Sequence, residues 1–493
     1  TKYNVLKSEL NIKNKRISEN PFDSDRKLMS TLNIEGSSYK VHTKGAIDNL
    51  LKIADKALVG GEVIALSKEI KEQFIKAAEA MSDSALRVLG VAYKDTADVL
   101  EPQDMEKDLI LIGMVGMIDP PRMEVKDSIK EAKTAGITPI MITGDHKNTA
   151  VAIAKELGIA SSIEQSLTGA EIDQLTDAEF SRDIKKYRVF ARVSPEHKVK
   201  IVRAFKAQNN IVSMTGDGVN DAPSLKYADI GVAMGITGTD VSKGASDMIL
   251  TDDNFTTIVH AIEEGRNIYN NIKKSVIFLL SCNLGEVISI FASILFFWPV
   301  PLMPTQILWI NLITDTLPAI ALGVDPGDKD VMRRKPRNPK ESFFAQGAGV
   351  RAVIGGTLIG ILTLLAFYFG LKEHGYSMTS ASIPDEVLTY ARTMAFIVLA
   401  TSQLFFSFTM RNSLKSIFKV GLFSNKFLVV SFIVGFLLQV MVVSTPLSYA
   451  FNMCNLTFKD WDLVIIFSII PLIINEIIKS FRRIKERKEE EEF

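Results

Sequence analysis

The strongest constraint on the fold is an abrupt change in the distribution of charge near residue 275. Residues 275–297 contain one charged side chain, Glu286, and residues 304–324 contain one, Asp315, whereas charges are dense before residue 275. An apolar run of roughly 20 residues spans a bilayer core of about 30 Å. The averages over 493 residues, 47% hydrophobic and 23% charged, conceal this division. We therefore expect a soluble part followed by a membrane bundle, which excludes a purely soluble enzyme, a disordered chain and a single-span receptor.

Hydropathy predicts six membrane spans. They cover about residues 275–297, 305–324, 350–371, 388–409, 426–445 and 462–479. The connections before the first span and after the second, fourth and sixth are rich in Lys and Arg, and the three opposite loops contain almost none. Because positive charge accumulates on the cytosolic side, we expect a multi-pass membrane protein with residues 1–274 and the charged tail in the cytosol.

Composition bears on three other questions. The 57 Lys and Arg residues balance the 57 Asp and Glu residues, so the net charge gives no support to nucleic-acid binding. The two cysteines, Cys282 in an apolar run and Cys454 in a late loop, do not read as a disulfide framework. The chain begins at Thr1 with residues typical of a domain interior, which suggests a piece of a longer protein.

Strand, turn and helix alternate in the second part of the soluble region. The β-rich runs at residues 137–143 and 210–215 each end in a Thr-Gly-Asp turn, and residues 123–135 and 147–157 have helical periodicity. This pattern predicts a parallel, doubly wound sheet whose ligands lie at the carboxyl ends of the strands. Both Thr-Gly-Asp turns fall at such ends.

The first part of the soluble region has a different pattern. Short strands at residues 38–44 and 88–94 accompany a helix at about residues 67–82. Residues 1–118 are therefore expected to form a separate α+β unit.

The most informative stretch is TGDGVNDAPSLKYADIGVAMG, from Thr215 to Gly235. Three carboxylates, Asp217, Asp221 and Asp229, lie close together in it, two of them in a glycine-containing loop directly after a strand. Hard oxygen ligands on such a loop suit Mg²⁺, which keeps several waters and takes one or two carboxylates plus phosphate. A polar surface turn is the alternative interpretation.

This stretch resembles the hinge motif of the P-type cation-transporting ATPases, within the haloacid-dehalogenase-like phosphotransferase fold. Six further motifs of that family occur in the family's order, and the similarity covers essentially the whole chain. They are FDSDRK at Phe22–Lys27, KGA at Lys44–Ala46, DPPR at Asp119–Arg122, TGD at Thr143–Asp145, ARVSPEHK at Ala191–Lys198 and NLITDTLPAIALG at Asn311–Gly323.

The resemblance implies a site for ATP and a site for phosphoryl transfer. The implied nucleotide-binding residues are Phe22, which would stack on adenine, Lys44 and Arg87, which would reach the phosphates and ribose, and Thr143, Gly144, Asp145, Arg192 and Lys198. The implied catalytic residues are Thr143, Gly144 and Asp145 around the phosphoryl group, Lys198 neutralising its oxygens, and Asp217, Asn220 and Asp221 around Mg²⁺. These roles agree with the chemistry, because positioning and cations over the equatorial oxygens catalyse phosphoryl transfer.

Three family motifs are absent from the sequence. The family forms an aspartyl-phosphate on the Asp of DKTGT, a covalent step that divides one difficult reaction into two. Neither DKTGT nor the TGE and PEGL segments occur, and in the family all three precede the FDSDRK region. The chain therefore resembles the carboxyl-terminal portion of a pump. Its expected partner is the missing amino-terminal part, without which it should not form the phosphoenzyme.

The membrane half contains a second set of polar residues. Asn283 and Glu286 are three residues apart in one span and share a helix face, as do Asn311, Thr314 and Asp315 in the next. Oxygen groups that face each other across two helices suit a hard cation, and an intramembrane carboxylate is a functional-site candidate. Hydrogen bonding between helices is the alternative role.

NLITDTLPAIALG with SCNLGE resembles the calcium-pump subgroup of the family. Pro318 removes a helix hydrogen bond and is expected to free carbonyl groups for coordination. Gln403 stands where the two-site calcium pumps have a glutamate, so we predict one Ca²⁺ per cycle, bound mainly by Asn311 and Asp315. Glu286 would be a ligand, a proton carrier in counter-transport, or both.

These inferences predict a fold that is α/β plus membrane all-α: a partial α+β nucleotide-binding domain, a partial haloacid-dehalogenase-like Rossmannoid domain and a six-helix transmembrane bundle. The expected divisions are 1–118 for the nucleotide-binding part, 119–254 for the phosphorylation domain without its first strand and nucleophile, 255–274 for a stalk helix, 275–480 for the transmembrane helices and 481–493 for the tail.

The expected function is that of the carboxyl-terminal part of an ATP-driven Ca²⁺ pump in the cell (plasma) membrane, with ATP and Mg²⁺ in the soluble part, Ca²⁺ as cargo and the lipid bilayer around the helices. A P-type pump for Mn²⁺ or Na⁺ remains an alternative, as does a non-catalytic nucleotide- and cation-binding membrane protein. A phosphatase fused to a secondary transporter is disfavoured because its nucleophile would also have to be present.

Overall fold

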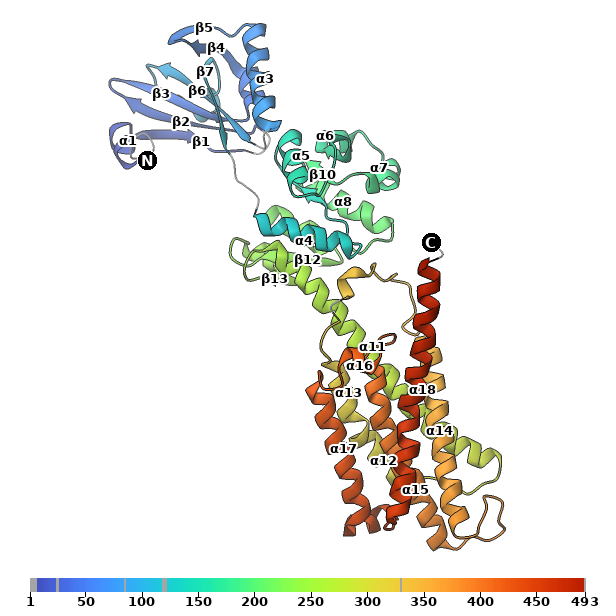
Figure 1. Cartoon of the computed structure of the whole chain (residues 1–493). Helices are drawn as coiled ribbons and strands as arrows, with labels where there is room; N and C mark the ends of the chain where they lie inside the picture. Colours follow the sequence, from blue (N-terminus) through green and yellow to red (C-terminus); the bar gives the residue numbers. More distant parts are fainter. Residues whose placement is uncertain (1–6, 24–25, 84–85, 118–121, 329, 492–493) are drawn as a thin grey trace. The chain divides into compact units, whose positions relative to one another are not determined.

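The computed structural model describes residues 7–23, 26–83, 86–117, 122–328 and 330–491, with side chains for these residues apart from 7–8, 123 and 485–491. The chain divides into two compact units, Thr1–His260 and Ala261–Phe493 (Figure 1). The expected boundary between residues 118 and 119 lies outside the described residues, as do Asp119–Pro121 of the DPPR motif, Ser24 and Asp25 of FDSDRK, and most side chains of the tail.

The first unit begins with a seven-stranded mixed sheet in the order β1-β2-β3-β6-β7-β4-β5. Its strands are β1 (Arg16–Asn20), β2 (Leu28–Glu35), β3 (Ser38–Gly45), β4 (Ala54–Val59), β5 (Glu62–Ala65), β6 (Arg87–Thr96) and β7 (Leu109–Met117), and its helices are α1 (Lys7–Lys13), α2 (Ile47–Ile53) and α3 (Lys68–Asp83). All strand pairs are antiparallel except β4 with β7. Strands β3 and β6 and helix α3 occupy the ranges that the sequence predicts.

The second part of this unit contains two three-stranded parallel sheets, β8-β10-β9 and β11-β12-β13, instead of the single doubly wound sheet predicted from the sequence. The strands are β8 (Met141–Ile142), β9 (Ser166–Thr168), β10 (Val189–Ala191), β11 (Ser213–Gly216), β12 (Ile230–Met234) and β13 (Met248–Leu250). Strands β8 and β11 are edges with a ladder partner on one side, and both are shorter than the runs predicted from the sequence. Ile142 of β8 packs against the cluster that contains Met214 of β11, so the two edges are neighbours.

Helices connect these strands and place their first turns beside the strand ends. They are α4 (Met123–Thr134), α5 (Lys147–Glu156), α6 (Gly169–Asp173), α7 (Asp177–Asp183), α8 (Pro195–Ala207), α9 (Ala222–Tyr227) and α10 (Asp240–Ala245). The start of α8 is fixed by a capping box, in which the Ser194 hydroxyl accepts from the His197 N–H and the His197 ring accepts from the Ser194 N–H. Pro195 at the first helical position reinforces this start.

The second unit has six helical spans long and apolar enough to cross a membrane, as the hydropathy predicts. The spans are α11 (Phe255–Leu295), α12 to α13, α14 (Ala348–Glu373), α15 (Asp385–Met410), α17 (Lys426–Ser444) and α18 (Phe458–Glu491), and the short helix α16 covers Ile417–Val420. The second span is interrupted, because a π-helical segment, η5 (Ile310–Thr314), separates α12 (Pro304–Trp309) from α13 (Thr316–Gly323).

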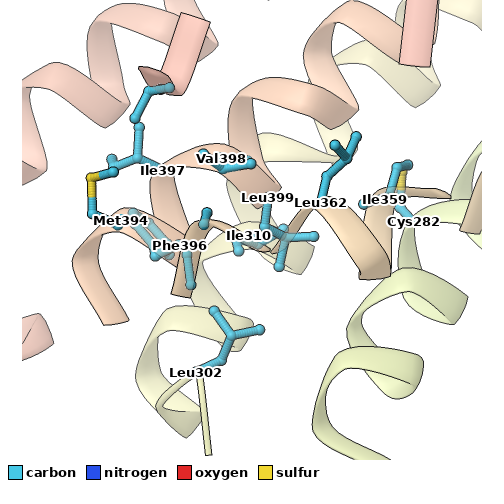
Figure 2. Packing of buried hydrophobic residues seen from close by; sticks show 14 of the residues in the cluster. Cys282, Leu302, Ile310, Ile359, Leu362, Met394, Phe396, Ile397, Val398 and Leu399 are labelled. Carbon is cyan, nitrogen blue, oxygen red and sulfur yellow. The ribbon is translucent and has the colours of Figure 1, made fainter. Parts of the chain in front are cut away.

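Helix α15 lies at the centre of the bundle. In its apolar window 94% of the residues are buried, against 17–50% in the other five spans. Figure 2 shows Met394 and residues 396–399 of α15 packed among Ile359 and Leu362 of α14 and Ile310 of the interrupted span. The centre of this core is therefore supplied by one helix that the others surround.

Glycines allow α11 and α14 to approach closely. A Cβ added at Gly356 of α14 would meet the Ser281 carbonyl of α11 at 2.7 Å, and one added at Gly360 would meet the Gly285 carbonyl at 2.9 Å. This four-residue spacing of small residues is a common device where helices pack inside a bilayer.

We predict that Gly356→Ala destabilises the membrane unit by about 1–3 kcal/mol, because the added methyl group must displace the backbone of α11. Gly265→Ala is the matched control, since a Cβ at Gly265 of α11 meets nothing within 4 Å and alanine favours the helix. Thermal unfolding of the two purified variants in detergent tests this packing. An equal effect of both substitutions would contradict it.

Candidate functional site

The turn after β8 is held in a fixed conformation by its own side chains. The Thr143 hydroxyl accepts from the Asp145 N–H and donates to Asp145 Oδ2, both at 3.1 Å. Gly144 between them is exposed, and a Cβ there would meet nothing within 4 Å. The turn therefore presents its backbone to the surface at the carboxyl end of a parallel strand, where ligands of such sheets bind.

Two arginines contact this turn from different elements. Arg87, at the start of β6, lies 3.7 Å from Asp145. Arg192, directly after β10, donates its backbone N–H to the Asp145 carbonyl at 3.1 Å. Its φ of 52° is unusual for a residue other than glycine. Such a conformation is maintained only by surrounding contacts and is common at functional sites.

The Arg192 guanidinium forms an ion pair with Asp48 of α2 at 2.9 Å. Burial acts to raise the pKa of Asp48, but the hydrogen bond and charge of Arg192 outweigh it, so the pKa lies below its ordinary value. Asp48 is therefore ionised at neutral pH and fixes Arg192 beside the turn.

The loop after β11 is organised around the buried Asp221 carboxylate. Its Oδ2 accepts from the backbone N–H groups of Asp217 and Gly218, at 3.2 and 3.1 Å, and its Oδ1 pairs with Lys198 in the first turn of α8. Each oxygen thus has a partner within this chain, one in the loop and one on α8. Asp221 acts here as a positioning residue, and the sequence interpretation of it as part of a metal shell has no direct support from this geometry.

Asp217 and Asn220 of the same loop are exposed. Their oxygens can receive a hard cation, as the sequence suggests, because nothing in the loop consumes them. Within the described residues no three His, Cys, Asp or Glu side chains gather into a ready-made metal centre. This fits an ion such as Mg²⁺, which completes its shell with waters and ligand phosphate oxygens.

The sequence-predicted nucleotide residues lie at one end of the seven-stranded sheet. In the β3–β6 ladder Lys44 opposes Val91, and Arg87 lies four residues before Val91, so Lys44 and Arg87 share a face. Phe22, 63% exposed, follows β1 at the same end, because the end of β1 pairs with the start of β2. The structure thus places Phe22, Lys44 and Arg87 at one end of the sheet, with their side chains exposed.

In the membrane unit, Glu286 and Asp315 are buried side by side in different spans. They are 4% and 0% exposed, and they lie close enough for their charges to interact. Glu286 Oε2 accepts from the Asn311 amide at 3.0 Å. Its Oε1 and both oxygens of Asp315 have no hydrogen-bond partner among the described residues. Leaving such atoms unsatisfied in a bilayer costs several kcal/mol, which makes them candidates for binding an ion.

The π-helical segment η5 widens the helix directly before Asp315. The Asp315 N–H donates to the Ile310 carbonyl, five residues earlier. Pro318 has no N–H to offer the Thr314 carbonyl four residues before it. An interrupted helix whose hydrogen-bond ladder is broken beside a buried carboxylate is a typical ion site within membranes.

Two further amides face this cluster. Gln403 of α15 lies close enough to Glu286 to act on its carboxylate, although its buried amide makes no hydrogen bond of ordinary geometry in the described part of the chain. Gln439 of α17 donates to Thr314 Oγ1 at 2.8 Å and leaves its own oxygen unsatisfied. The sequence analysis did not identify Gln439. A single amide side chain in an otherwise strongly apolar span could have indicated it as a candidate site residue.

Asn283 is not brought into the cluster. It lies on an exposed face of α11, and its amide donates to the Leu279 carbonyl of the same helix at 2.8 Å. The cluster within this chain therefore comprises Glu286, Asn311, Thr314 and Asp315.

Known families match both halves of the chain. A family described as "Cation transporting ATPase, C-terminus" matches residues 299–481, and one described as "P-type ATPase, cytoplasmic domain N" matches residues 1–124. "Calcium-transporting ATPase 1" of Bacillus cereus is 55% identical over 98% of this chain and 55% of its own length. "Calcium-transporting ATPase" of Bacillus subtilis is 44% identical over 93% and 51%. "Calcium-transporting ATPase 2, endoplasmic reticulum-type" of Arabidopsis thaliana is 35% identical over 96% and 52%.

A unit with a polar turn and an acidic loop at strand ends, joined to helices of which six in the described part of the chain can cross a membrane, is the architecture of an integral membrane protein. The chain belongs to the P-type ATPases. It spans about half the length of the curated relatives that it matches.

The role of Asp221 gives a prediction about stability. Asp221→Ala should lower the free energy of unfolding by about 3–5 kcal/mol, because it leaves Lys198 and two loop N–H groups without their acceptor. Asp217→Ala is the matched control in the same loop, and we expect it to change stability by less than about 0.5 kcal/mol. Thermal unfolding without nucleotide compares them, and similar midpoints would refute the positioning role.

Proposed function

We propose that this chain is the carboxyl-terminal part of an ATP-driven Ca²⁺ pump that works through an aspartyl-phosphate cycle in the cell membrane. The observation that carries the proposal is the set of unpartnered buried oxygens on Glu286 and Asp315 between neighbouring spans. Buried carboxylates are rare in membranes and face ion pathways. The names of the relatives, all calcium-transporting ATPases, favour Ca²⁺ as the cargo.

The donor set supports a hard cation. Carboxylate, amide and carbonyl oxygens are the ligands of Ca²⁺, which takes six to eight of them. We propose that Asn311 and Asp315 are the main ligands, that Thr314 adds its hydroxyl or carbonyl, and that Glu286 is a ligand, a proton carrier or both. Asn283 would join them only when a segment outside this chain covers the exposed face of α11.

In the soluble unit we propose ATP as the energy source. Phe22, Lys44, Arg87 and Arg192 would bind the nucleotide, with Thr143–Asp145 and Lys198 around the transferred phosphoryl group. The residues fit Mg²⁺, since Asp217 and Asn220 offer open oxygens and phosphate would supply more. When bound, this ion would offset negative charge on the phosphoryl oxygens.

The nucleophile of the cycle would come from the part of the protein that precedes this sequence in the relatives. The edges β8 and β11 support this proposal, because each has one side without a ladder partner among the described residues, where a parallel strand of a haloacid-dehalogenase-like sheet would pair. On this proposal residues 1–118 belong to the nucleotide-binding domain, 119–254 to the phosphorylation domain and 255–274 to a stalk, with the soluble part and tail in the cytosol.

In the protein as it occurs in its membrane, Asp315→Asn should abolish Ca²⁺-dependent phosphorylation by radioactive ATP, because the ion loses its buried countercharge. Asp385→Asn, an exposed carboxylate at the start of α15, should leave that phosphorylation unchanged. Addition of Mn²⁺ or Na⁺ in competition with Ca²⁺ distinguishes the alternative cargoes. Persistence of normal calcium dependence in Asp315→Asn would falsify the site assignment.

The buried amide of Gln403 leads to a prediction of the number of Ca²⁺ ions that the protein binds. One Ca²⁺ per protein should bind to the purified protein at saturation, since an amide at this position supplies no second countercharge. Gln403→Glu adds a carboxylate near Glu286 and should raise the number toward two. Equilibrium binding of radioactive Ca²⁺ measures both values, and two ions in the unaltered protein would contradict the prediction.

A further inference from the structure

A cavity of about 140 Å³ lies at one end of the membrane bundle. A water requires roughly 10–15 Å³ of such space, so the cavity can hold a group of several heavy atoms. Its walls come from α11, from the start of α14, from the end of α15 and from α18. These are helix ends on the side where positive charge accumulates, at the depth where apolar spans give way to charged connections.

The lining is strongly cationic. Seven of its twenty residues are Lys or Arg, and one, Asp328, is acidic. Four of the seven cations have carboxylate partners. These pairs are Lys274 and Arg411 with Asp325, Arg334 with Asp328, and Lys479 with Glu476.

The other three cations, Lys273, Arg351 and Arg482, have no carboxylate partner among the described side chains. They converge on the segment before α14. Lys273 donates to the Ala345 carbonyl at 3.4 Å, Arg351 donates to the Gln346 carbonyl at 3.5 Å, and a Cβ at Gly347 would lie 3.8 Å from Arg482 Nη2. Both hydrogen bonds are long and therefore weak, so they compensate little of the charge of Lys273 and Arg351.

The three cations also repel one another. Arg351 lies within electrostatic range of both Lys273 and Arg482. Each is partly buried, which weakens screening by solvent. Glu341 acts on Lys273 from a distance without forming an ion pair. An anion with several oxygens stabilises partly buried like charges. The oxygens of a phosphate group, for example, accept charge-assisted hydrogen bonds from more than one cation at once.

The surroundings of the cavity indicate where this phosphate comes from. Ile354 lines the cavity and is 40% exposed. Val350 and Val353 on the same helix are 57% and 55% exposed, and Phe481 of α18 is 69% exposed. Apolar side chains that continue from a basic cavity suit acyl chains attached to the bound headgroup, and basic pockets between helices bind anionic lipids.

We propose that this cavity binds the headgroup phosphate of an anionic phospholipid, with Lys273, Arg351 and Arg482 as its ligands and the acyl chains along α14. Amide side chains that line the cavity, such as Asn270 and Asn412, bond the headgroup hydroxyls. This site is independent of the proposed cation site, since its residues belong to other parts of the bundle.

The test uses the protein purified from its membrane and reconstituted in phosphatidylcholine with or without phosphatidylglycerol. Native mass spectrometry counts the phosphatidylglycerol molecules retained, and thermal unfolding measures their stabilising effect. Arg351→Gln and Arg482→Gln should each weaken retention by roughly tenfold, as expected for loss of one charge-assisted hydrogen bond. Lys419→Gln, an exposed cation of α16 between α15 and α17, is the matched control and should retain the lipid.

Three outcomes overturn the proposal. Equal losses in Lys419→Gln and the cavity variants would mean a diffuse attraction of the basic surface. Equal stabilisation by inorganic phosphate or glycerol phosphate without lipid would identify a soluble anion as the ligand. Retention of phosphatidylglycerol by Arg351→Gln and Arg482→Gln, with unfolding midpoints in pure phosphatidylcholine like that of the unaltered protein, would show that these cations do not form the site.

Discussion

The membrane unit depends on how each buried carboxylate is compensated. Asp325, after α13, pairs with Arg411 of α15 and Lys274 of α11, each at 2.9 Å, and accepts from the Asn425 amide before α17. One side chain thereby joins four spans at one end of the bundle. Breaking a buried pair of this kind costs about 3–5 kcal/mol, because the remaining charge has no water to replace its partner. Asp325 is thus a structural carboxylate.

Asp315 is equally buried but has the opposite environment. It lies inside the second span, ten residues before Asp325, which follows that span, and no hydrogen bond to either of its oxygens exists among the described residues. Uncompensated burial is tolerated only where an ion or a proton can supply the missing charge. The contrast between Asp315 and Asp325 therefore makes Asp315 the candidate for ion binding and Asp325 a structural residue, without reference to any relative. The π-helical segment before Asp315 strengthens this distinction, since such segments often occur at functional sites.

The sequence predicts the features that depend on local patterns, but not those that depend on contacts between distant segments. The spans, the strands β3 and β6 and helices α3 to α5 follow from periodicity and apolar runs, which are local properties. The break in the second span was expected only as an effect of Pro318, and its π-helical form was not. The sequence could not predict that the Asp221 carboxylate already has its partners or that Asn283 is exposed. Both features depend on which residues from distant segments fill the space around them. Motif spacing identifies the chemical groups of a site, but it does not tell which of them already have partners.

The groups that lack a partner within the described part of this chain can be compared with those that have one. The buried carboxylates of Asp325 and Asp221 have their partners within this chain, whereas the features that the proposed function uses are open. These are the adjoining edges β8 and β11, the exposed loop oxygens at Asp217 and Asn220, and the unsatisfied oxygens of Glu286 and Asp315. The open edges of β8 and β11 lie in the part of the fold that holds the Thr143–Asp145 turn. The pump proposal accounts for these edges and for the unfilled membrane cluster together, because phosphorylation and ion binding are coupled steps in the proposed cycle.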